Sequence, residues 1–162
     1  LRPGPGVGGH CIAVDPWFIV SKSPEQAPLL HTARKINDSK PSWVIEKIKT
    51  AMKDFLQENP DRTAKDVIIA CYGLTFKPDI DDLRESPALK ITQELANLHH
   101  GKILGVEPNI DKLPKDIVGI ELVNFELAVK KADINLILVG HSEFKNKNLN
   151  LKYLIDTAGL WQ

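Results

Sequence analysis

Residues 8–15, which read Gly-Gly-His-Cys-Ile-Ala-Val-Asp, hold side chains of the types that covalent chemistry requires. A cysteine attacks as the thiolate, which needs a local field from backbone N–H groups, a helix end or a cation, and glycines allow such groups to approach closely. Cys11 could therefore attack a carbonyl carbon. Asp15 could then position a water molecule, or accept its proton, when the acyl-cysteine is hydrolysed. The alternative is that Cys11 is a small buried hydrophobic residue and Asp15 the first residue of an Asp-Pro turn.

Residues 73–87 are the second stretch of interest, as a binding site. They lie between a predicted buried strand and a predicted helix N-terminus, where a parallel sheet presents ligand-binding groups and where a phosphate is favoured. Lys77 and Arg84 are the candidate partners of an anion. The alternative is that both pair with acids of their own loop, which are Asp79, Asp81, Asp82 and Glu85. We interpret these acids as caps, turn formers and partners of the two cations, and we predict no metal site because nothing indicates that they converge on one ion.

Several other polar residues are given no catalytic role. His10 is adjacent to Cys11, but neighbouring residues of an extended loop point apart, so we expect it to be structural or to line the substrate site. Glu107 ends a predicted strand, where dinucleotide-binding folds place a ribose-binding acid. The glycine fingerprint of such folds is absent before it, so Glu107 is interpreted as an ordinary loop residue. The isolated histidines are assigned nothing, and these are His31, His99, His100 and His141.

The glycines near the N-terminus do not form a dinucleotide-binding fingerprint. Gly4, Gly6 and Gly9 match its spacing only loosely, and no strand precedes them. Residues 1–22 are instead predicted to be a loop rich in glycine and proline that ends in the apolar residues 17–20.

Helical segments are expected after this loop. Ser23, Pro24 and Gln26 have the spacing of a helix start, although Pro28 would delay the regular helix and Pro41 would mark a second start or a kink. Apolar residues then recur at helical spacing over residues 43–56, in a stripe wide enough to pack on a partner subunit as well as on the same chain.

The pattern changes after residue 60 to strands and helices in alternation. Strands are predicted at residues 67–72, 102–106, 134–139 and 153–155, and helices at residues 86–98 and 125–131. This alternation predicts an α/β fold, a Rossmann-like parallel sheet with helices on both faces, preceded by the cysteine loop and long helices. We divide the chain into a first part, residues 1–60, and a sheet domain, residues 61–162.

Composition narrows the choice of function. Lys and Arg (21) balance Asp and Glu (21), so no basic field favours nucleic acid or an anionic membrane. No apolar run is long enough to span a membrane and no signal peptide is recognisable, so a cytoplasmic setting is expected. Cys71 lies in an apolar run and is predicted to be a core residue, and both cysteines are expected to be reduced thiols. The sequence begins inside a loop motif without Met, as a fragment of a longer chain would.

Two long motifs carry a family resemblance. Residues 4–16, Gly-Pro-Gly-Val-Gly-Gly-His-Cys-Ile-Ala-Val-Asp-Pro, and residues 73–88, Gly-Leu-Thr-Phe-Lys-Pro-Asp-Ile-Asp-Asp-Leu-Arg-Glu-Ser-Pro-Ala, resemble the UDP-glucose/GDP-mannose dehydrogenase family. The first motif, together with Ala-Arg-Lys-Ile-Asn-Asp at residues 33–38, is most similar to members that oxidise UDP-N-acetylmannosamine. The resemblance extends over essentially the whole chain.

The resemblance implies that this chain is the C-terminal part of an enzyme that uses two NAD⁺ to oxidise the C6 alcohol of a UDP-sugar to a carboxylate. It makes Cys11 the nucleophile, which forms a thiohemiacetal and then a thioester, and it places Asp15 at the acid associated with hydrolysis. The family's N-terminal NAD-binding domain and its catalytic lysine fall outside these residues, so this chain alone is expected to be inactive.

The resemblance also implies binding roles. Gly8 would lie against the substrate through its backbone, Phe76 and Lys77 would contact the nucleotide sugar, and Arg84 would reach the NAD. Family members form dimers or larger assemblies through their central helices, which implies a homodimer here. The alternative function is a non-catalytic module for nucleotide-sugar binding and dimerisation. Such a module would have no need of the pair formed by Cys11 and Asp15.

Overall fold

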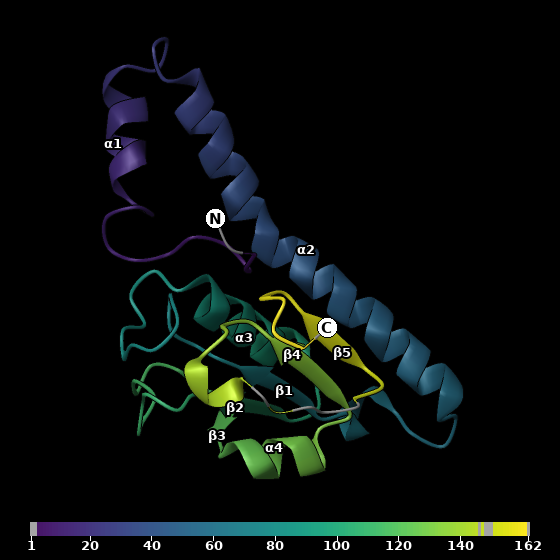
Figure 1. Cartoon of the computed structure of the whole chain (residues 1–162). Coiled ribbons are helices and arrows are strands. Elements are labelled where there is room, and N and C mark those ends of the chain that lie inside the picture. Colours follow the sequence, from purple (N-terminus) through teal and green to yellow (C-terminus); the bar gives the residue numbers. More distant parts are fainter. Residues whose placement is uncertain (1–2, 146, 148–150, 162) are drawn as a thin grey trace.

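Five short parallel strands form the centre of the structure, in the order β3-β2-β1-β4-β5 (Figure 1). The computed structural model describes residues 3–145, 147 and 151–161. The strands are β1 (Ile69–Tyr72), β2 (Ile103–Val106), β3 (Ile120–Leu122), β4 (Ile134–Ile137) and β5 (Leu154–Asp156). The predicted α/β fold with a parallel sheet is confirmed. β3 was missed by the sequence reasoning, because it is a half-exposed edge strand of three residues with a charged residue in the middle.

The two helices predicted for the sheet domain are present, and both begin at side-chain caps. α3 (Pro87–Leu98) starts where the Ser86 hydroxyl accepts a hydrogen bond from the Leu89 N–H. α4 (Phe125–Lys131) starts where the Asn124 side chain accepts one from the Leu127 N–H. These caps satisfy backbone donors that the first helical turn leaves free, which is why local sequence places both helix starts correctly.

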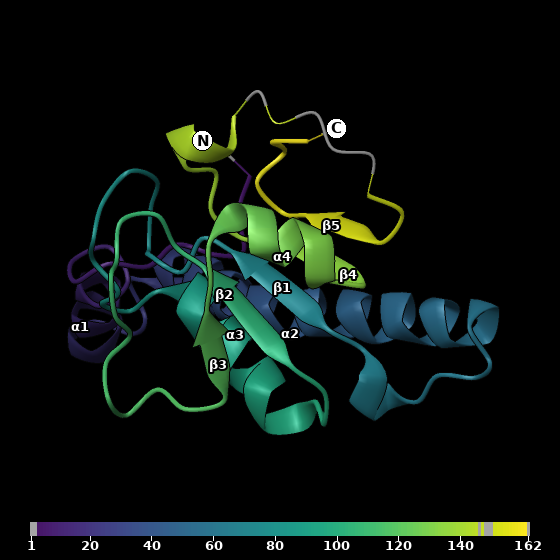
Figure 2. The ribbon, with the colours of Figure 1, turned by 90° about the horizontal axis from the view of Figure 1, so that it is seen from below.

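The sheet is covered on both faces, as Figure 2 shows. Side chains of β1 alternate, so Ile69 and Cys71 point into the layer formed with α2 and α3, while Ala70 and Tyr72 point into the layer formed with α4. Apolar residues of α2 complete the first layer, and these are Val44, Ile45, Ile48 and Phe55. The apolar stripe of residues 43–56 is therefore used largely by the chain's own sheet.

The N-terminal helices differ from the prediction. Residues 17–20, predicted to belong to a loop, form part of α1 (Asp15–Lys22), which begins with an acid and a proline in its first turn. Ser23 is the C-terminal cap of α1 and does not start a helix. The next helix, α2 (Pro28–Glu58), begins at the proline that was expected only to delay it. Proline is well suited to a first turn, because its fixed φ is helical and its missing N–H would have no partner there.

Pro41 neither starts nor breaks a helix, since it lies inside α2, which is 31 residues long. Proline costs the helix a hydrogen bond to the carbonyl four residues earlier, which belongs to Asn37. That carbonyl faces the N-terminal loop, where it lies 3.7 Å from the position of a Cβ built on Gly6. Packing of the following turns on the sheet holds the helix together past the proline.

The α1–α2 hairpin projects beyond the sheet (Figure 1). It carries large apolar side chains that are more than half exposed, namely Phe18, Ile19, Leu29, Ile36 and Trp43. No helix among the described residues combines the length and apolar character needed to cross a membrane.

Candidate functional site

The site lies at the carboxyl ends of β1 and β4. The chain leaves β1 for β2 on one side and later returns to β4 on the other, so the crevice between β1 and β4 is the topological switch point of the sheet. Residues 73–86, the loop that follows β1, lie at this edge. The structure therefore places the second predicted stretch where open α/β sheets bind ligands.

A cavity of about 330 Å³ opens at this edge. Its walls come from the N-terminal loop, the loop after β1, and the segments after β4 and β5. The lining includes Pro3, Gly4, Pro5, Gly6, Thr75, Phe76, Lys77, Pro78, Gly140, Lys145, Ala158, Gly159 and Leu160. Lys77 and Lys145 therefore line a space of the size that small-molecule ligands occupy.

Phe76 and Lys77 both face this region. The Lys77 ammonium lies 5.5 Å from the centre of the Phe76 ring and is exposed, while the Phe76 side chain is half-buried. Among the described residues Lys77 forms no ion pair. The alternative in which both cations are neutralised by their own loop therefore does not describe Lys77.

The glycine loop is docked directly on the loop after β1. A Cβ built on Gly8 would lie 2.2 Å from the Glu85 carbonyl oxygen and 2.7 Å from Cδ of Pro87. Gly9, with φ +89°, would place a Cβ 2.9 Å from the Phe76 ring. No other residue fits at Gly8 without a backbone shift, so the two motifs of the sequence form one surface.

Cys11 is exposed, in a turn immediately before α1. Its carbonyl accepts hydrogen bonds from the N–H groups of Val14 (3.0 Å) and Asp15 (2.8 Å), which close the turn and start the helix. The alternative of a buried Cys11 is wrong. His10 and Asp15 are also exposed, so all three side chains are open to a ligand.

Two residues of α2 fasten this loop, although the sequence reasoning gave them no such role. The Asn37 amide binds the backbone of Val7 through both of its ends, with Val7 N–H donating to Oδ1 at 2.7 Å. Arg34 is buried, pairs with Asp38 at 2.8 Å, and donates to the Ile12 carbonyl at 3.5 Å. The motif of residues 33–38 thus holds the cysteine loop against α2 through hydrogen bonds to its backbone.

Arg84 is paired within its own loop, as the alternative reading proposed. Its Nη2 lies 2.6 Å from Asp82, and its Nε donates to the same carboxylate. This contact lowers the pKa of Asp82 to about 2, first through the Arg84 hydrogen bonds and least through the charge of His10. The pKa of Arg84 is raised, chiefly by Asp82 and in small part by the charge of Cys11. The Asp82–Arg84 pair therefore lies within electrostatic range of the loop that carries His10 and Cys11.

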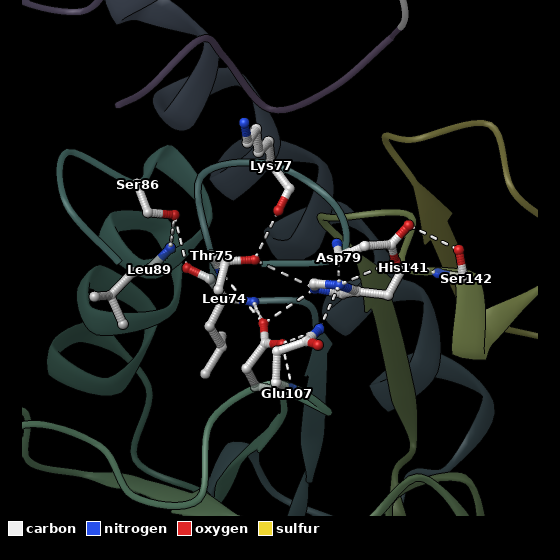
Figure 3. A network of polar contacts seen from close by, with 10 residues as sticks. Leu74, Thr75, Lys77, Asp79, Ser86, Leu89, Glu107, His141 and Ser142 are labelled. Atoms are coloured by element: carbon white, nitrogen blue, oxygen red, sulfur yellow. Dashed lines mark hydrogen bonds and ion pairs between the residues drawn. The ribbon is translucent and has the colours of Figure 1, made fainter. Parts of the chain in front are cut away.

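Glu107 and His141 are the largest departure from the sequence reasoning. The interpretation of Glu107 as an ordinary loop residue is wrong, because it is buried at the carboxyl end of β2 and accepts hydrogen bonds from the Leu74 and Thr75 N–H groups at 2.7 and 3.2 Å (Figure 3). His141, which was given no role, is fully buried and lies 3.1 Å from Glu107. Both follow apolar strands at the same sheet edge, and that shared position was the available signal.

The pKa of Glu107 is lowered despite its burial. Burial is the largest single influence and raises it, but hydrogen bonds from His141, Leu74 and Asn109 together outweigh that effect. Glu107 is therefore held as the carboxylate that its two backbone donors require.

A metal site is not favoured at the nearby cluster of Asp79, His141 and Glu143, whose ligand atoms lie within 4.8 Å of one another. Nδ1 of His141 lies 3.0 Å from the Asp79 N–H, which donates to it. The Asp79 carboxylate accepts hydrogen bonds from the Ser142 N–H and hydroxyl, both at 2.7 Å. The ligand atoms of Asp79 and His141 are thus already hydrogen-bonded within the protein, and Asp79 acts as the turn former that was predicted, with φ +61°.

Comparisons with known proteins agree with this geometry. Residues 70–162 match the model of the UDP-glucose/GDP-mannose dehydrogenase family, UDP binding domain, and residues 1–39 match the central domain of the same family. The UDP-N-acetyl-D-mannosamine dehydrogenase of Salmonella typhi is 52% identical over 166 residues, which cover 100% of this chain and 39% of that protein. The NDP-N-acetyl-D-galactosaminuronic acid dehydrogenase of Ralstonia nicotianae is 49% identical, over 99% of this chain and 37% of that protein.

Solved structures give the same result. The UDP-N-acetyl-mannosamine dehydrogenase of Staphylococcus aureus superimposes with a TM-score of 0.74 at 37% identity, over 100% of this chain and 37% of that chain. The UDP-D-ManNAc dehydrogenase of Pyrococcus horikoshii gives a TM-score of 0.76 at 28% identity, over 99% of this chain and 37% of that chain. The chain thus spans about two fifths of the proteins it matches.

Proposed function

The chain belongs to the UDP-glucose/GDP-mannose dehydrogenase family, and we propose that it is the C-terminal part of an NAD-dependent 6-dehydrogenase that oxidises UDP-N-acetylmannosamine to the uronate. The observation that carries this proposal is the docking of the glycine loop, with exposed Cys11, on the loop that carries Phe76 and Lys77. A nucleophile and a binding cavity are thereby joined at the switch point of the sheet. We propose residues 1–60 as the catalytic loop and central helices, and residues 61–162 as the UDP-sugar-binding domain.

The UDP moiety is proposed to bind in the cavity of about 330 Å³ between the N-terminal loop and the segments after β1, β4 and β5. Lys77 supplies an exposed cation without a competing ion pair among the described residues, and Lys145 lines the same space. Gly8 is proposed to lie against the sugar through its backbone. Gly8 and Phe76 belong to the two docked loops. A substrate would therefore lie across the contact between these loops, with its nucleotide near Phe76 and its reacting sugar near Gly8.

The chemistry proposed for this chain takes place on Cys11. The thiolate adds to the carbonyl carbon of the C6 aldehyde and forms a thiohemiacetal, which loses a hydride to become a thioester. Water attacks the thioester carbon, the carboxylate product leaves, and Cys11 is released as the thiolate. Asp15, at the start of α1, is proposed to orient this water or take its proton. Oxidation of an alcohol to a carboxylate removes two hydrides, which NAD⁺ would accept.

The described residues fit one contact to NAD and not a complete dinucleotide site. Arg84 is exposed beside the Cys11 loop, and Asp82 occupies its Nε and Nη2. Its Nη1 makes no hydrogen bond to any described residue, and is the group that we propose to reach a cofactor phosphate. The described β1 loop lacks the glycine fingerprint that cradles a pyrophosphate. We therefore propose that other parts of the enzyme hold most of the NAD and that this chain alone does not turn over.

A homodimer through the central helices is also proposed. Exposed apolar side chains of the α1–α2 hairpin support it, because Phe18, Leu29 and Ile36 are each more than half exposed. A surface of this kind on a projecting hairpin is typical of a protein interface.

The test uses the intact protein with a panel of UDP- and GDP-sugars, measuring NADH released per sugar. The expected result is two NADH per UDP-N-acetylmannosamine. Cys11→Ser should abolish nearly all of this four-electron turnover, because a hydroxyl is a far weaker nucleophile. Cys71→Ala is the matched control, since Cys71 is buried in the core away from the loop, and should keep its activity. Normal uronate formation by Cys11→Ser would favour the non-catalytic binding module for this chain.

Asp15 is tested separately. Asp15→Asn should let the acyl-enzyme accumulate, visible by mass spectrometry as an adduct on Cys11 after substrate and NAD⁺ are added. An unimpaired rate without an adduct would exclude the deacylation role.

A further inference from the structure

A buried polar network lies directly beneath the proposed substrate loop (Figure 3). At its centre, Glu107 and His141 meet at 3.1 Å, and both side chains are fully buried. Glu107 accepts from the N–H groups of Leu74 and Thr75, the first residues of the loop after Gly73. Residues from the ends of three different strands, β1, β2 and β4, are thereby joined.

The hydrogen bonds assign one state to the His141 ring. Its Nδ1 accepts from the Asp79 N–H at 3.0 Å and faces Nδ2 of Asn109 at 3.1 Å, so Nδ1 carries no proton. Its Nε2 must then carry the proton and donate it to Glu107. His141 is thus a neutral bridge between a carboxylate on one side and the backbone of the loop on the other.

The network leads to Lys77 by a short route. The Thr75 hydroxyl lies 3.4 Å from Nε2 of His141 and donates to the Lys77 carbonyl at 3.0 Å. His141 therefore contacts the loop on both sides of Lys77 in the sequence. It lies beside the Thr75 hydroxyl, and it accepts a hydrogen bond from the Asp79 N–H. Figure 3 shows the Lys77 side chain pointing away from the network, toward the N-terminal loop that lines the same cavity.

Burying a polar network of this kind in a core has a high cost in desolvation free energy. Burying a carboxylate is expensive unless hydrogen bonds replace its water, and an apolar core would be no less stable. A satisfied network does, however, fix one conformation of the backbone that it binds. Here that backbone is the turn that presents Lys77, which includes Asp79 at φ +61°.

We propose that His141 and Glu107 are positioning residues, which fix the loop of residues 74–79 so that Lys77 and Phe76 meet the diphosphate of the nucleotide sugar. This inference rests on the proposed function of the cavity as the UDP site. His141 and Glu107 do not contact the ligand and act through the loop.

The test is calorimetric titration of UDP into the intact protein and its variants. In His141→Gln the amide lies where Nε2 lay, so it can still bind Glu107 but loses the acceptor of the Asp79 N–H. UDP affinity should fall about tenfold, as for loss of one good contact. His141→Asn puts an acceptor near the place of Nδ1 and should recover part of this loss. His99→Gln is the matched control, because the His99 ring also bonds a backbone group, the Val67 carbonyl at 2.8 Å, but beside the start of β1.

A double-mutant cycle distinguishes positioning from simple stabilisation. If His141 acts through Lys77, His141→Gln should cost much less than tenfold in a Lys77→Ala background, because coupled residues are not additive. Thermal unfolding of each variant shows whether His99→Gln and His141→Gln lose comparable stability. Full additivity, or unchanged UDP affinity in His141→Gln, would overturn the proposal.

Two further outcomes are decisive. If His141→Gln does not fold, Asn109→Ala removes the side-chain amide that contacts both His141 and Glu107, and should weaken UDP binding by a smaller factor, about threefold. Unchanged affinity in that variant overturns the positioning role. If the unaltered protein binds no UDP and Lys77→Ala changes nothing, the proposed function of the cavity has failed and the positioning role fails with it.

Discussion

Replacing Gly8 with alanine should separate the two loops that form the proposed active site. The added Cβ would stand 2.2 Å from the Glu85 carbonyl oxygen and 3.1 Å from its carbonyl carbon. Both are backbone atoms of a turn that ends at the start of α3, and Glu85 itself has φ +49°. No side-chain rotation can relieve this contact, so one of the two backbones has to move.

The size of the movement follows from contact distances. Non-bonded carbon atoms are at their optimum at about 3.5–4.0 Å, so the loop must shift by roughly 1 Å or more. Overpacking of this type costs about 1–3 kcal/mol when the structure yields by moving backbone. A displacement of about 1 Å at a catalytic group can lower the rate roughly a hundredfold. We therefore expect kcat of the intact enzyme to fall by about that factor while the sheet domain stays folded.

The assay combines steady-state kinetics with the alkylation rate of Cys11 and thermal unfolding. Gly4→Ala is the matched control for stability and for Cys11 reactivity, since a Cβ at Gly4 has no heavy atom within 4 Å. Gly8→Ala with normal kcat and an unchanged alkylation rate would show that the glycine loop is not docked on the Glu85 turn during turnover.

Three other predictions are independent of Gly8. Iodoacetamide at mildly alkaline pH should modify Cys11 rapidly and Cys71 only after unfolding, because burial raises the pKa of Cys71 to about 12; equal rates for both, read by peptide mass spectrometry, would contradict the core position. Lys77→Ala should weaken UDP-sugar binding about tenfold to a hundredfold with less effect on NAD⁺, and Arg84→Ala should do the reverse, both measured by calorimetry. Because the pKa of Glu107 is lowered in the folded state, its ionisation stabilises the protein above the ordinary glutamate pKa, ~4.3, and this contribution is lost as pH falls through the lower folded value. Glu107→Gln should therefore make the free energy of unfolding depend less steeply on pH in that acidic range, as measured by urea unfolding at several pH values. An unchanged dependence on pH would count against the buried carboxylate.

Much of the fold could be predicted because its signals are local. Ser86 and Asn124 are residue types that favour a helix start, and a helical sequence follows each of them. The apolar runs before Gly73 and Gly140 have the length of buried strands. α1 was not predicted, because its apolar residues follow a glycine-rich stretch. A second start or a kink was predicted at Pro41, but packing on the sheet keeps α2 continuous there. Local propensity is a weak guide wherever a long helix is held by the sheet beneath it.

The candidate site shows the same division. Cys11, Asp15, Lys77 and Arg84 could be selected from the sequence because their chemical types stand in two contiguous motifs. Their exposure, and the pairing of Arg84 with Asp82, needed the structure, because the sequence allowed either a buried or an exposed thiol and either free or paired cations.

By itself the sequence determined which residues could do chemistry and which segments form the strands and capped helices, since these properties depend on residue type and short-range spacing. Only the tertiary structure decided that Gly8 packs against the Glu85 turn and that His141 meets Glu107 across 34 positions of sequence. The contact of His141 with Glu107 joins segments that parallel strand pairing brings to one sheet edge, and its partners are set by the strand order β3-β2-β1-β4-β5, which no local pattern encodes. The contact of Gly8 depends on α2, whose Asn37 and Arg34 hold the glycine loop.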